Sequence, residues 1–272
     1  MPDHTDHRAA GATPEPVPSS DPARSAAPEP APEVDARADA DAKADNVDAN
    51  ADADTRAFRT LLRGLRVWES ELPSFAARRA PAEPLPLFRQ WLSEAAEAGV
   101  PEPHTMSLAT ADAAGDPSVR IVMLHDADEH GWHFGTHRDS RKGRELAARP
   151  RAALAFYWPA VGRQVRVRGT VTAAGPEESA ADLHHRSTGA LAAALVGRQS
   201  EVLGSAEELA RAADAAWERA AREPDAPVPS WTLYVLRADE VEFFQGDPHR
   251  RQHVRLNYRR TEGGWEKELL WP

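Results

Sequence analysis

Side chains that suit an anion gather in residues 120–146. The donors are Arg120 on one side of a predicted turn and Thr136, Ser140, Arg141 and Lys142 on the other. Guanidinium, ammonium and hydroxyl groups at the start of a helix are typical phosphate ligands. A hairpin would bring the two groups of donors side by side. This stretch therefore predicts a phosphate-bearing cofactor held against a β-sheet.

Short strands and a few helices must position these donors. Apolar or alternating runs predict strands at 106–111, 118–124, 132–136, 151–158, 164–172, 231–236, 240–244, 254–258 and 265–270. Helical spacing predicts helices at 84–99, 140–148, 177–194 and 205–222, the last with Ser205 as its N-cap. We expect 118–124 and 132–136 to pair as the hairpin. Many short antiparallel strands with helices between them predict a mainly β fold with α, a barrel with satellite helices.

The first 55 residues differ in composition from the rest of the chain. They contain thirteen acidic and four basic residues, and they account for nine of the ten net negative charges. With almost no large apolar residue, this segment cannot offset its ordering entropy, so we expect 1–55 to be a disordered acidic tail. Residues 56–83 then form a lead-in and 84–272 the barrel domain. The near-neutral charge of 56–272 gives no reason to expect nucleic acid or an anionic membrane as partner.

Residue types also exclude several kinds of site. The chain has no cysteine, so it has no disulfide, thiolate nucleophile or thiolate metal ligand. His184 and His185 are adjacent and would point about 100° apart on a helix. No HExxH or glycine-rich nucleotide motif is present, so we expect neither a metal site nor a doubly wound nucleotide fold. No apolar run approaches the roughly 20 residues that cross a bilayer, and we expect a cytoplasmic protein.

A series of motifs carries a family resemblance. They are LFRQWL (87–92), LAT (108–110), RIVML (120–124), FGTH (134–137), SRKGREL (140–146), RAALAFYW (151–158), RQV (163–165), RQS (198–200), VEFFQG (241–246) and RQHVR (251–255). In this order, residues 87–272 resemble the pyridoxamine 5′-phosphate oxidase family, flavoproteins with an antiparallel split β-barrel. The GTH and GREL segments, with RQSEVL (198–203), are more similar to the phenazine-biosynthesis branch than to the enzyme that makes pyridoxal 5′-phosphate, here called the vitamin enzyme.

The resemblance implies an FMN-binding homodimer with each flavin at the subunit interface. The implied FMN contacts are Arg120, Ile121, Val122, Met123, Thr136, Ser140, Arg141, Lys142, Gln164, Gln199, Ser200, Phe244 and Arg255. Gln199 and Ser200 are expected to reach the flavin from the partner subunit, and Phe244 replaces a family tryptophan. Arg251 and His253 correspond to residues that meet the substrate over the flavin ring and are the catalytic candidates. The alternative for His253 is a purely structural role.

The substrate side departs from the family pattern. Where the vitamin enzyme holds its substrate's phosphate with lysine, tyrosine and serine, this chain has His125, Asp182 and Ala190, and only Arg186 is kept. Two like unit charges about 4 Å apart repel by roughly 1–4 kcal/mol, so an aspartate beside a phosphate is unfavourable. The expected substrate contacts are His125, Asp182, Arg186, Arg251 and His253. We expect a substrate without a phosphate, with Asp182 either meeting a cationic group or simply solvated.

We therefore expect an FMN-dependent oxidase that transfers a hydride from a small, reduced, nitrogen-containing metabolite to flavin and then to O2. A phenazine precursor is one such substrate. The first alternative is a pyridoxamine or pyridoxine 5′-phosphate oxidase with a remodelled phosphate grip. The second is a flavin- or heme-binding split-barrel protein without turnover.

Overall fold

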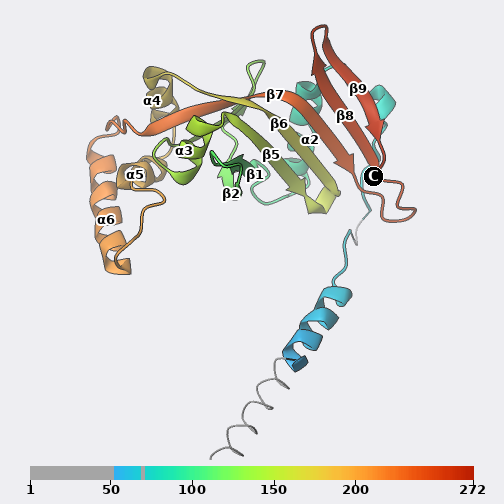
Figure 1. The fold of residues 1–272 in the computed structure, drawn as a ribbon, viewed down its shortest axis with the longest axis horizontal. Coiled ribbons are helices and arrows are strands. Elements are labelled where there is room, and N and C mark those ends of the chain that lie inside the picture. Colours follow the sequence, from blue (N-terminus) through green and yellow to red (C-terminus); the bar gives the residue numbers. More distant parts are fainter. Residues whose placement is uncertain (1–51, 69–70) are drawn as a thin grey trace, which may run out of the picture. The chain divides into compact units, whose positions relative to one another are not determined.

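The computed structural model describes residues 52–68 and 71–272 (Figure 1). The chain divides into two units, 1–65 and 66–272. In the first unit the described residues form a helix over 52–64. Residues 1–51 of the predicted disordered tail, 1–55, lie outside the described part of the chain. Residues 52–55 begin this helix, so the predicted disorder is wrong for them. Within that described part, no helix combines the length and the apolar character needed to span a bilayer.

An antiparallel sheet curved into a half-barrel dominates the second unit, and the expected mainly β fold with satellite helices is confirmed (Figure 1). Its strands are β1 (Thr105–Ala111), β2 (Pro117–Met123), β3 (Asp126–Ala127), β4 (Trp132–His137), β5 (Arg151–Trp158), β6 (Arg163–Ala173), β7 (Trp231–Gln245), β8 (Val254–Thr261) and β9 (Gly264–Leu270). They follow the order β2-β1-β5-β6-β7-β4-β3, and β8 and β9 continue from the far part of β7.

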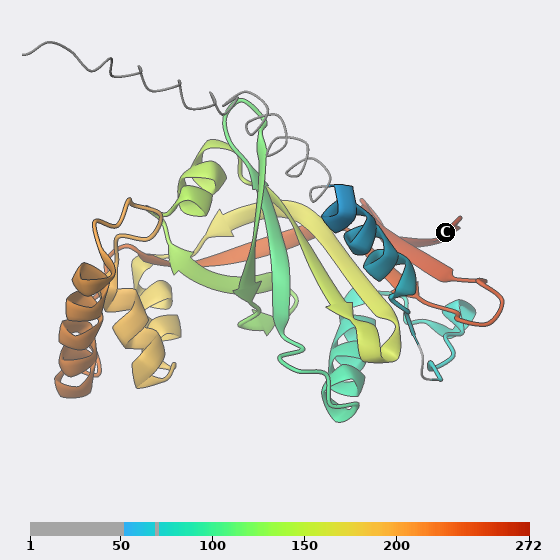
Figure 2. The ribbon, with the colours of Figure 1, turned by 90° about the horizontal axis from the view of Figure 1, so that it is seen from below.

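Helices cover one face of the sheet and one of its ends. They are α2 (Pro84–Glu97), α3 (Arg141–Ala148), α4 (Pro176–His184), α5 (Thr188–Val196) and α6 (Ala206–Arg222), with short 3-10 turns at Ala77–Arg79 and Pro159–Val161. Helix α2 begins with proline in its first turn and buries Phe88 and Trp91 in the barrel core, as its apolar spacing predicts. Figures 1 and 2 show α4, α5 and α6 together at one end of the sheet, away from β8 and β9.

The predicted hairpin between 118–124 and 132–136 is wrong. β2 pairs with β1, and β4 pairs with β3 and β7. The tight turn after β1 holds β2, because Asp112 accepts hydrogen bonds from the backbone of Ala114, Gly115 and Asp116. β2 and β4 still contact each other, because the curved sheet brings its outer strands together.

Two further boundaries differ from expectation. The predicted helix 177–194 is two helices, because the chain turns at His185–Arg186 and Ser187 caps the start of α5. The predicted strands 231–236 and 240–244 are one strand, β7, which passes through a β-bulge opposite Arg168 and Gly169. β7 therefore runs the whole length of the sheet and links its two ends.

Candidate functional site

Five residues from two distant segments form a polar cradle at the start of α3: Thr136, Arg141, Lys142, Gln199 and Ser200. Nζ of Lys142 donates to Oε1 of Gln199 at 2.7 Å, and Oγ1 of Thr136 donates to the same oxygen at 3.1 Å. The backbone N–H of Arg141 donates to Oγ of Ser200 at 3.1 Å. These contacts form within one chain. The expectation that Gln199 and Ser200 reach the flavin bound by the partner subunit stays a prediction.

Arg120 lies beside this cradle in a network centred on the buried Glu145. Its guanidinium is 3.1 Å from the Glu145 carboxylate, which also accepts from Ser118 at 2.6 Å and from Nε of Arg141 at 2.8 Å. Burial would raise the pKa of Glu145, but hydrogen bonds from Ser118, Thr110, Arg141 and Arg120 lower it to about 2. Glu145 therefore stays ionised and holds both arginines in place.

Lys142 carries the electrostatic signature of an anion site. Only 8% of the surface of Lys142 is exposed to solvent. Burial and the positive charge of Arg120 lower the pKa of Lys142 to about 8, although Glu145 acts in the opposite direction. A bound phosphate would offset both costs, because it would pair with the ammonium and relieve its repulsion from Arg120.

Ser140 and the expected FMN contacts on β2, Ile121, Val122 and Met123, do not form part of the polar cradle. The Ser140 hydroxyl is fully buried, accepts from the N–H of Gly143 and donates to the carbonyl of His137, so it serves as the helix cap. On β2, Val122 packs against the core, whereas Ile121 and Met123 point outward with 66% and 50% exposure. The outward pair remains available to a ligand or a partner.

A second cluster brings together three of the four residues at which the chain departs from or keeps the family pattern: His125, Asp182 and Arg186. Asp182 accepts from Nδ1 of His125 at 3.0 Å and from Nη2 of Arg186 at 3.1 Å. Its other oxygen accepts from Nε1 of Trp231 at 3.1 Å. Burial alone would raise the pKa of Asp182, but these hydrogen bonds, with the His125 charge, hold it well below its usual range. Asp182 is therefore a saturated acceptor, not a solvated surface group.

Trp231, which the sequence predicts only as a strand residue, contacts several members of this cluster. Its ring stacks on His125 with centroids 6.5 Å apart and meets His137 edge-on at 5.7 Å. A side chain at Gly135 would collide with both Trp231 and His125, which explains the glycine in the GTH motif. A cavity of about 790 Å³ opens beside the cluster, lined in part by Met123, His125, Asp182, Arg186 and Ala190.

The remaining predicted residues lie at the other end of β7. Gln164 is paired with Phe244 across β6 and β7, and Phe244 is paired with Arg255 across β7 and β8. Directly opposed residues share one face of a sheet, so these three form a row. Arg255 is held by Glu242 at 2.6 Å and by the carbonyl of Trp271 at 2.8 Å.

His253 and Arg251 lie in the loop that follows this row. Nδ1 of His253 accepts from the backbone N–H of Asp247 at 3.0 Å. The Asp247 carboxylate in turn accepts from the backbone of His249, Arg250 and Gln252, which secures the loop. Arg251 is exposed and has a φ of +56°, a conformation uncommon outside glycine.

Trp68 joins His253 and Phe244, although the sequence analysis did not single it out. Its ring centroid is 5.5 Å from that of His253 and 6.2 Å from that of Phe244. Its position in the lead-in segment, far from any motif, gave no signal that it would reach the barrel.

The cradle and the row are separated by the length of β7. Trp231 begins this strand and Phe244 nearly ends it, which corresponds to on the order of 40 Å of extended chain. Figure 1 shows β7 running from the helices at one end to β8 at the other. One chain therefore carries two half-sites that face different ends of its own sheet.

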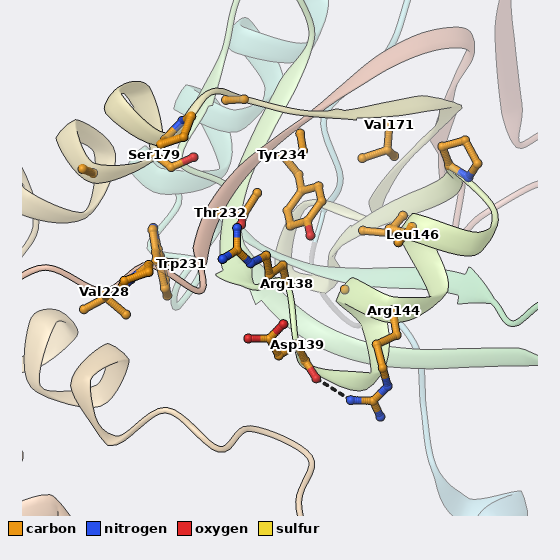
Figure 3. Close-up of a pocket in the computed structure, with 18 of the residues that line it drawn as sticks. Arg138, Asp139, Arg144, Leu146, Val171, Ser179, Val228, Trp231, Thr232 and Tyr234 are labelled. Carbon is orange, nitrogen blue, oxygen red and sulfur yellow. Dashed lines mark hydrogen bonds between the residues drawn. The ribbon is translucent and has the colours of Figure 1, made fainter.

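Another cavity, of about 920 Å³, lies between α3, α4 and the start of β7 (Figure 3). Its lining residues include the apolar Leu146, Trp231 and Tyr234 and the charged Arg138 and Arg144. None of the predicted site residues lines this cavity.

Comparison with known proteins decides the family. The profile described as pyridoxamine 5′-phosphate oxidase matches residues 92–243. The chain belongs to the pyridoxamine 5′-phosphate oxidase family. The profile described as the pyridoxine 5′-phosphate oxidase C-terminal dimerisation region matches residues 231–272, which include β7 and two residues of the row, Phe244 and Arg255.

Relatives within the pyridoxamine 5′-phosphate oxidase family carry two kinds of name. A pyridoxine/pyridoxamine 5′-phosphate oxidase from Salinibacter ruber is 44% identical over 193 residues, 70% of this chain and 89% of the relative. The crystal structure of PhzG from Burkholderia lata 383, in complex with tetrahydrophenazine-1-carboxylic acid, has a TM-score of 0.70 and 30% identity. That similarity covers 75% of this chain and 100% of PhzG. An FMN-binding protein from Nostoc punctiforme, 20% identical with a TM-score of 0.57, has the same fold.

Proposed function

We propose that this chain is an FMN-dependent oxidase acting on a small, reduced, nitrogen-containing substrate that lacks a phosphate. The observation that carries the substrate assignment is Asp182, whose carboxylate is saturated by His125, Arg186 and Trp231. The observation that carries the cofactor assignment is Lys142, a buried ammonium beside Arg120.

The cradle suits the phosphate of FMN. Lys142, Thr136 and the backbone N–H of Arg141 are donors that converge at the start of α3, where the helix dipole also favours an anion. Gln199 and Ser200 accept hydrogen bonds from these donors and line the same cradle, where they would also meet the cofactor. We assign the phosphate to the cradle, with Arg120 and Glu145 as its supporting network.

The row suits a flavin ring from a second chain. Because the row lies about 40 Å of strand away from the cradle, one copy of the chain would complete its cradle with the row of another. The match of residues 231–272 to a dimerisation region supports this arrangement. We propose a homodimer in which each flavin lies between the cradle of one subunit and Gln164, Phe244 and Arg255 of the other.

The chain's own residues would orient the substrate and manage its proton. Bound FMN would supply the hydride acceptor, with O2 as the proposed final electron acceptor. Because Nδ1 of His253 accepts from Asp247, the neutral imidazole carries its proton on Nε2 and can donate there to a substrate atom. Arg251, on the same loop, would supply a positive charge for an anionic substituent.

The substrate subsite disfavours a phosphate dianion. One positive charge on Arg186 is offset by one negative charge on Asp182, 3.1 Å away. A dianion placed here would meet Asp182 without a free cation to balance it, at a cost of roughly 1–4 kcal/mol for each pair of unit charges about 4 Å apart. The PhzG relative, described in complex with tetrahydrophenazine-1-carboxylic acid, supports a carboxylated, reduced heterocycle as the substrate class.

The second candidate is a pyridoxine or pyridoxamine 5′-phosphate oxidase. The names of relatives that are 41–45% identical favour it, as does the presence of Arg186. In this case Arg186 would have to leave Asp182 in order to meet the phosphate.

Oxygen uptake by the FMN-loaded protein separates the two candidates. We expect uptake with peroxide release on tetrahydrophenazine-1-carboxylate and far slower uptake on pyridoxine 5′-phosphate. Faster turnover of the phosphate substrate would favour the second candidate. A protein that retains no FMN, or that binds FMN and consumes no oxygen with either compound, would contradict both oxidase assignments.

A further inference from the structure

Trp68 is enclosed by residues of the row end of the site. Its ring lies edge-on to His253 with centroids 5.5 Å apart and tilted against Phe244 at 6.2 Å. The rings of Phe244 and His253 are themselves 5.3 Å apart, so the three rings form one aromatic cluster. The indole also covers Gly246, where an added Cβ would lie 3.0 Å from the Trp68 ring. A larger residue at 246 would therefore require the Trp68 ring to shift.

Two features of Trp68 are costly for folding alone. Its φ is +54°, in the left-handed region that bulky residues rarely adopt. Its indole Nε1 is buried and has no hydrogen-bond partner among the described residues. A strained backbone and a buried unpaired donor each reduce the stability of the folded protein. Such costs concentrate at ligand sites, because a ligand can satisfy the donor that the protein leaves unpaired.

We propose that Trp68 is a specificity-determining residue of the substrate site. Its indole forms an aromatic wall beside His253 that selects a planar ring substrate, and its Nε1–H donates to a carboxylate or ring nitrogen of that substrate. The proposal rests on the oxidase function proposed above and adds a residue and a substrate shape to it.

The chemistry of the cluster favours a flat, carboxylated heterocycle. Phe244 and Trp68 offer ring faces and edges, and aromatic pairs contribute binding energy beyond the area that they bury. Nε2–H of His253 and Nε1–H of Trp68 are neutral donors, which suit a single carboxylate or a ring nitrogen. A phosphate dianion gains less from two neutral donors, because charge pairing provides most of its binding energy.

The test uses FMN-loaded protein and phenazine-1-carboxylate, an oxidised probe that cannot be turned over. Trp68→Phe keeps a ring and removes the N–H, whereas Trp68→Ala removes both. Trp217→Phe is the matched control, because Trp217 is a half-exposed tryptophan on α6 outside the site. Calorimetry measures the dissociation constant of the probe. The difference in tryptophan emission between the native protein and Trp68→Phe gives the emission of Trp68.

We expect probe binding to weaken about tenfold in Trp68→Phe and about a hundredfold in Trp68→Ala, corresponding to about 1.4 and 2.7 kcal/mol. The probe should quench the Trp68 emission. The FMN content of both Trp68 variants and the probe affinity of Trp217→Phe should match those of the native protein. Unchanged probe affinity in Trp68→Ala with full FMN content would overturn the role of Trp68 and leave the oxidase function intact. A native protein that holds no FMN would instead overturn the proposed function, and this inference with it.

Discussion

Nζ of Lys142 lies 2.7 Å from Oε1 of Gln199, a residue 57 positions later in the same chain. Oγ1 of Thr136 donates to the same oxygen at 3.1 Å. The loop after α5 therefore completes the cradle at the start of α3 within one protomer. The cradle, to which we assign the FMN phosphate, and the row lie at opposite ends of β7.

Lys142→Met should weaken FMN binding by about 10- to 100-fold. The substitution keeps the length of the buried chain and removes a charge-assisted hydrogen bond, which contributes roughly 1.5–3 kcal/mol. Fluorescence titration of the apoprotein with FMN measures the effect. An unchanged dissociation constant would contradict the assignment of the phosphate to the cradle.

FMN binding should also weaken as the pH rises above about 8. The pKa of Lys142 is lowered to about 8 without a ligand. A bound phosphate favours the ammonium form, so binding above that pH requires uptake of a proton. The dissociation constant should rise by up to about tenfold per pH unit there, and the Lys142→Met variant should lack this dependence. A native affinity that stays constant from about pH 7 to about pH 9.5 would argue against this coupling.

Arg141→Ala should reduce FMN affinity by about tenfold. Its guanidinium pairs with Glu145 at the mouth of the cradle and contributes positive charge to it. Arg144→Ala, on the same short helix but bonded to the backbone of Asp139, is the control and should bind FMN as the native protein does. Equal losses in the two variants would indicate a general effect on α3 rather than a specific contact.

Asp182→Asn should shift the substrate preference toward phosphate. Removing the carboxylate frees Arg186 and removes the repulsion of a dianion, so kcat/KM for pyridoxine 5′-phosphate should rise about tenfold relative to that for tetrahydrophenazine-1-carboxylate. Asp239→Asn changes the net charge equally at an exposed pair with Arg151, and should leave the ratio unchanged. If both variants leave the ratio unchanged, Asp182 does not set the substrate class.

Mixed dimers should recover one working site. Lys142→Met damages the cradle and His253→Ala damages the other half-site. If each site combines two chains, a mixed dimer contains one intact site and one doubly damaged site, and half of the native oxidase activity should return. Co-expressed, differently tagged chains isolate this species, with dimers of a single variant as control. Absence of recovery would indicate that each chain builds its own site.

Local features of this fold were predictable from the sequence. Pro84 and Gly99 bracket α2, Ser140 caps α3, and the alternation of 164–172 marks β6, because these signals lie within a few residues of the element they specify. The donors at Thr136, Arg141 and Lys142 follow from the same kind of local signal, whereas their contacts with Gln199 and Ser200 do not.

Strand pairing and long-range contacts were not predictable in this way. Nothing local distinguishes a β2–β4 hairpin from the observed β1–β2 pair, since both have a turn at a suitable distance. The apolar runs at 231–236 and 240–244 did not reveal that a bulge keeps β7 continuous. Trp68 lies outside every motif, and only the folded chain places it on His253.

Anaerobic mixing of the FMN-loaded protein with each candidate substrate separates the two candidate functions most directly. The visible absorbance of the flavin reports hydride transfer in a single turnover, independent of the reaction with oxygen. Tetrahydrophenazine-1-carboxylate should bleach this band rapidly, and pyridoxine 5′-phosphate should do so at least about tenfold more slowly, because Asp182 disfavours the phosphate. Rapid bleaching by pyridoxine 5′-phosphate, with none by tetrahydrophenazine-1-carboxylate, would contradict the proposed function.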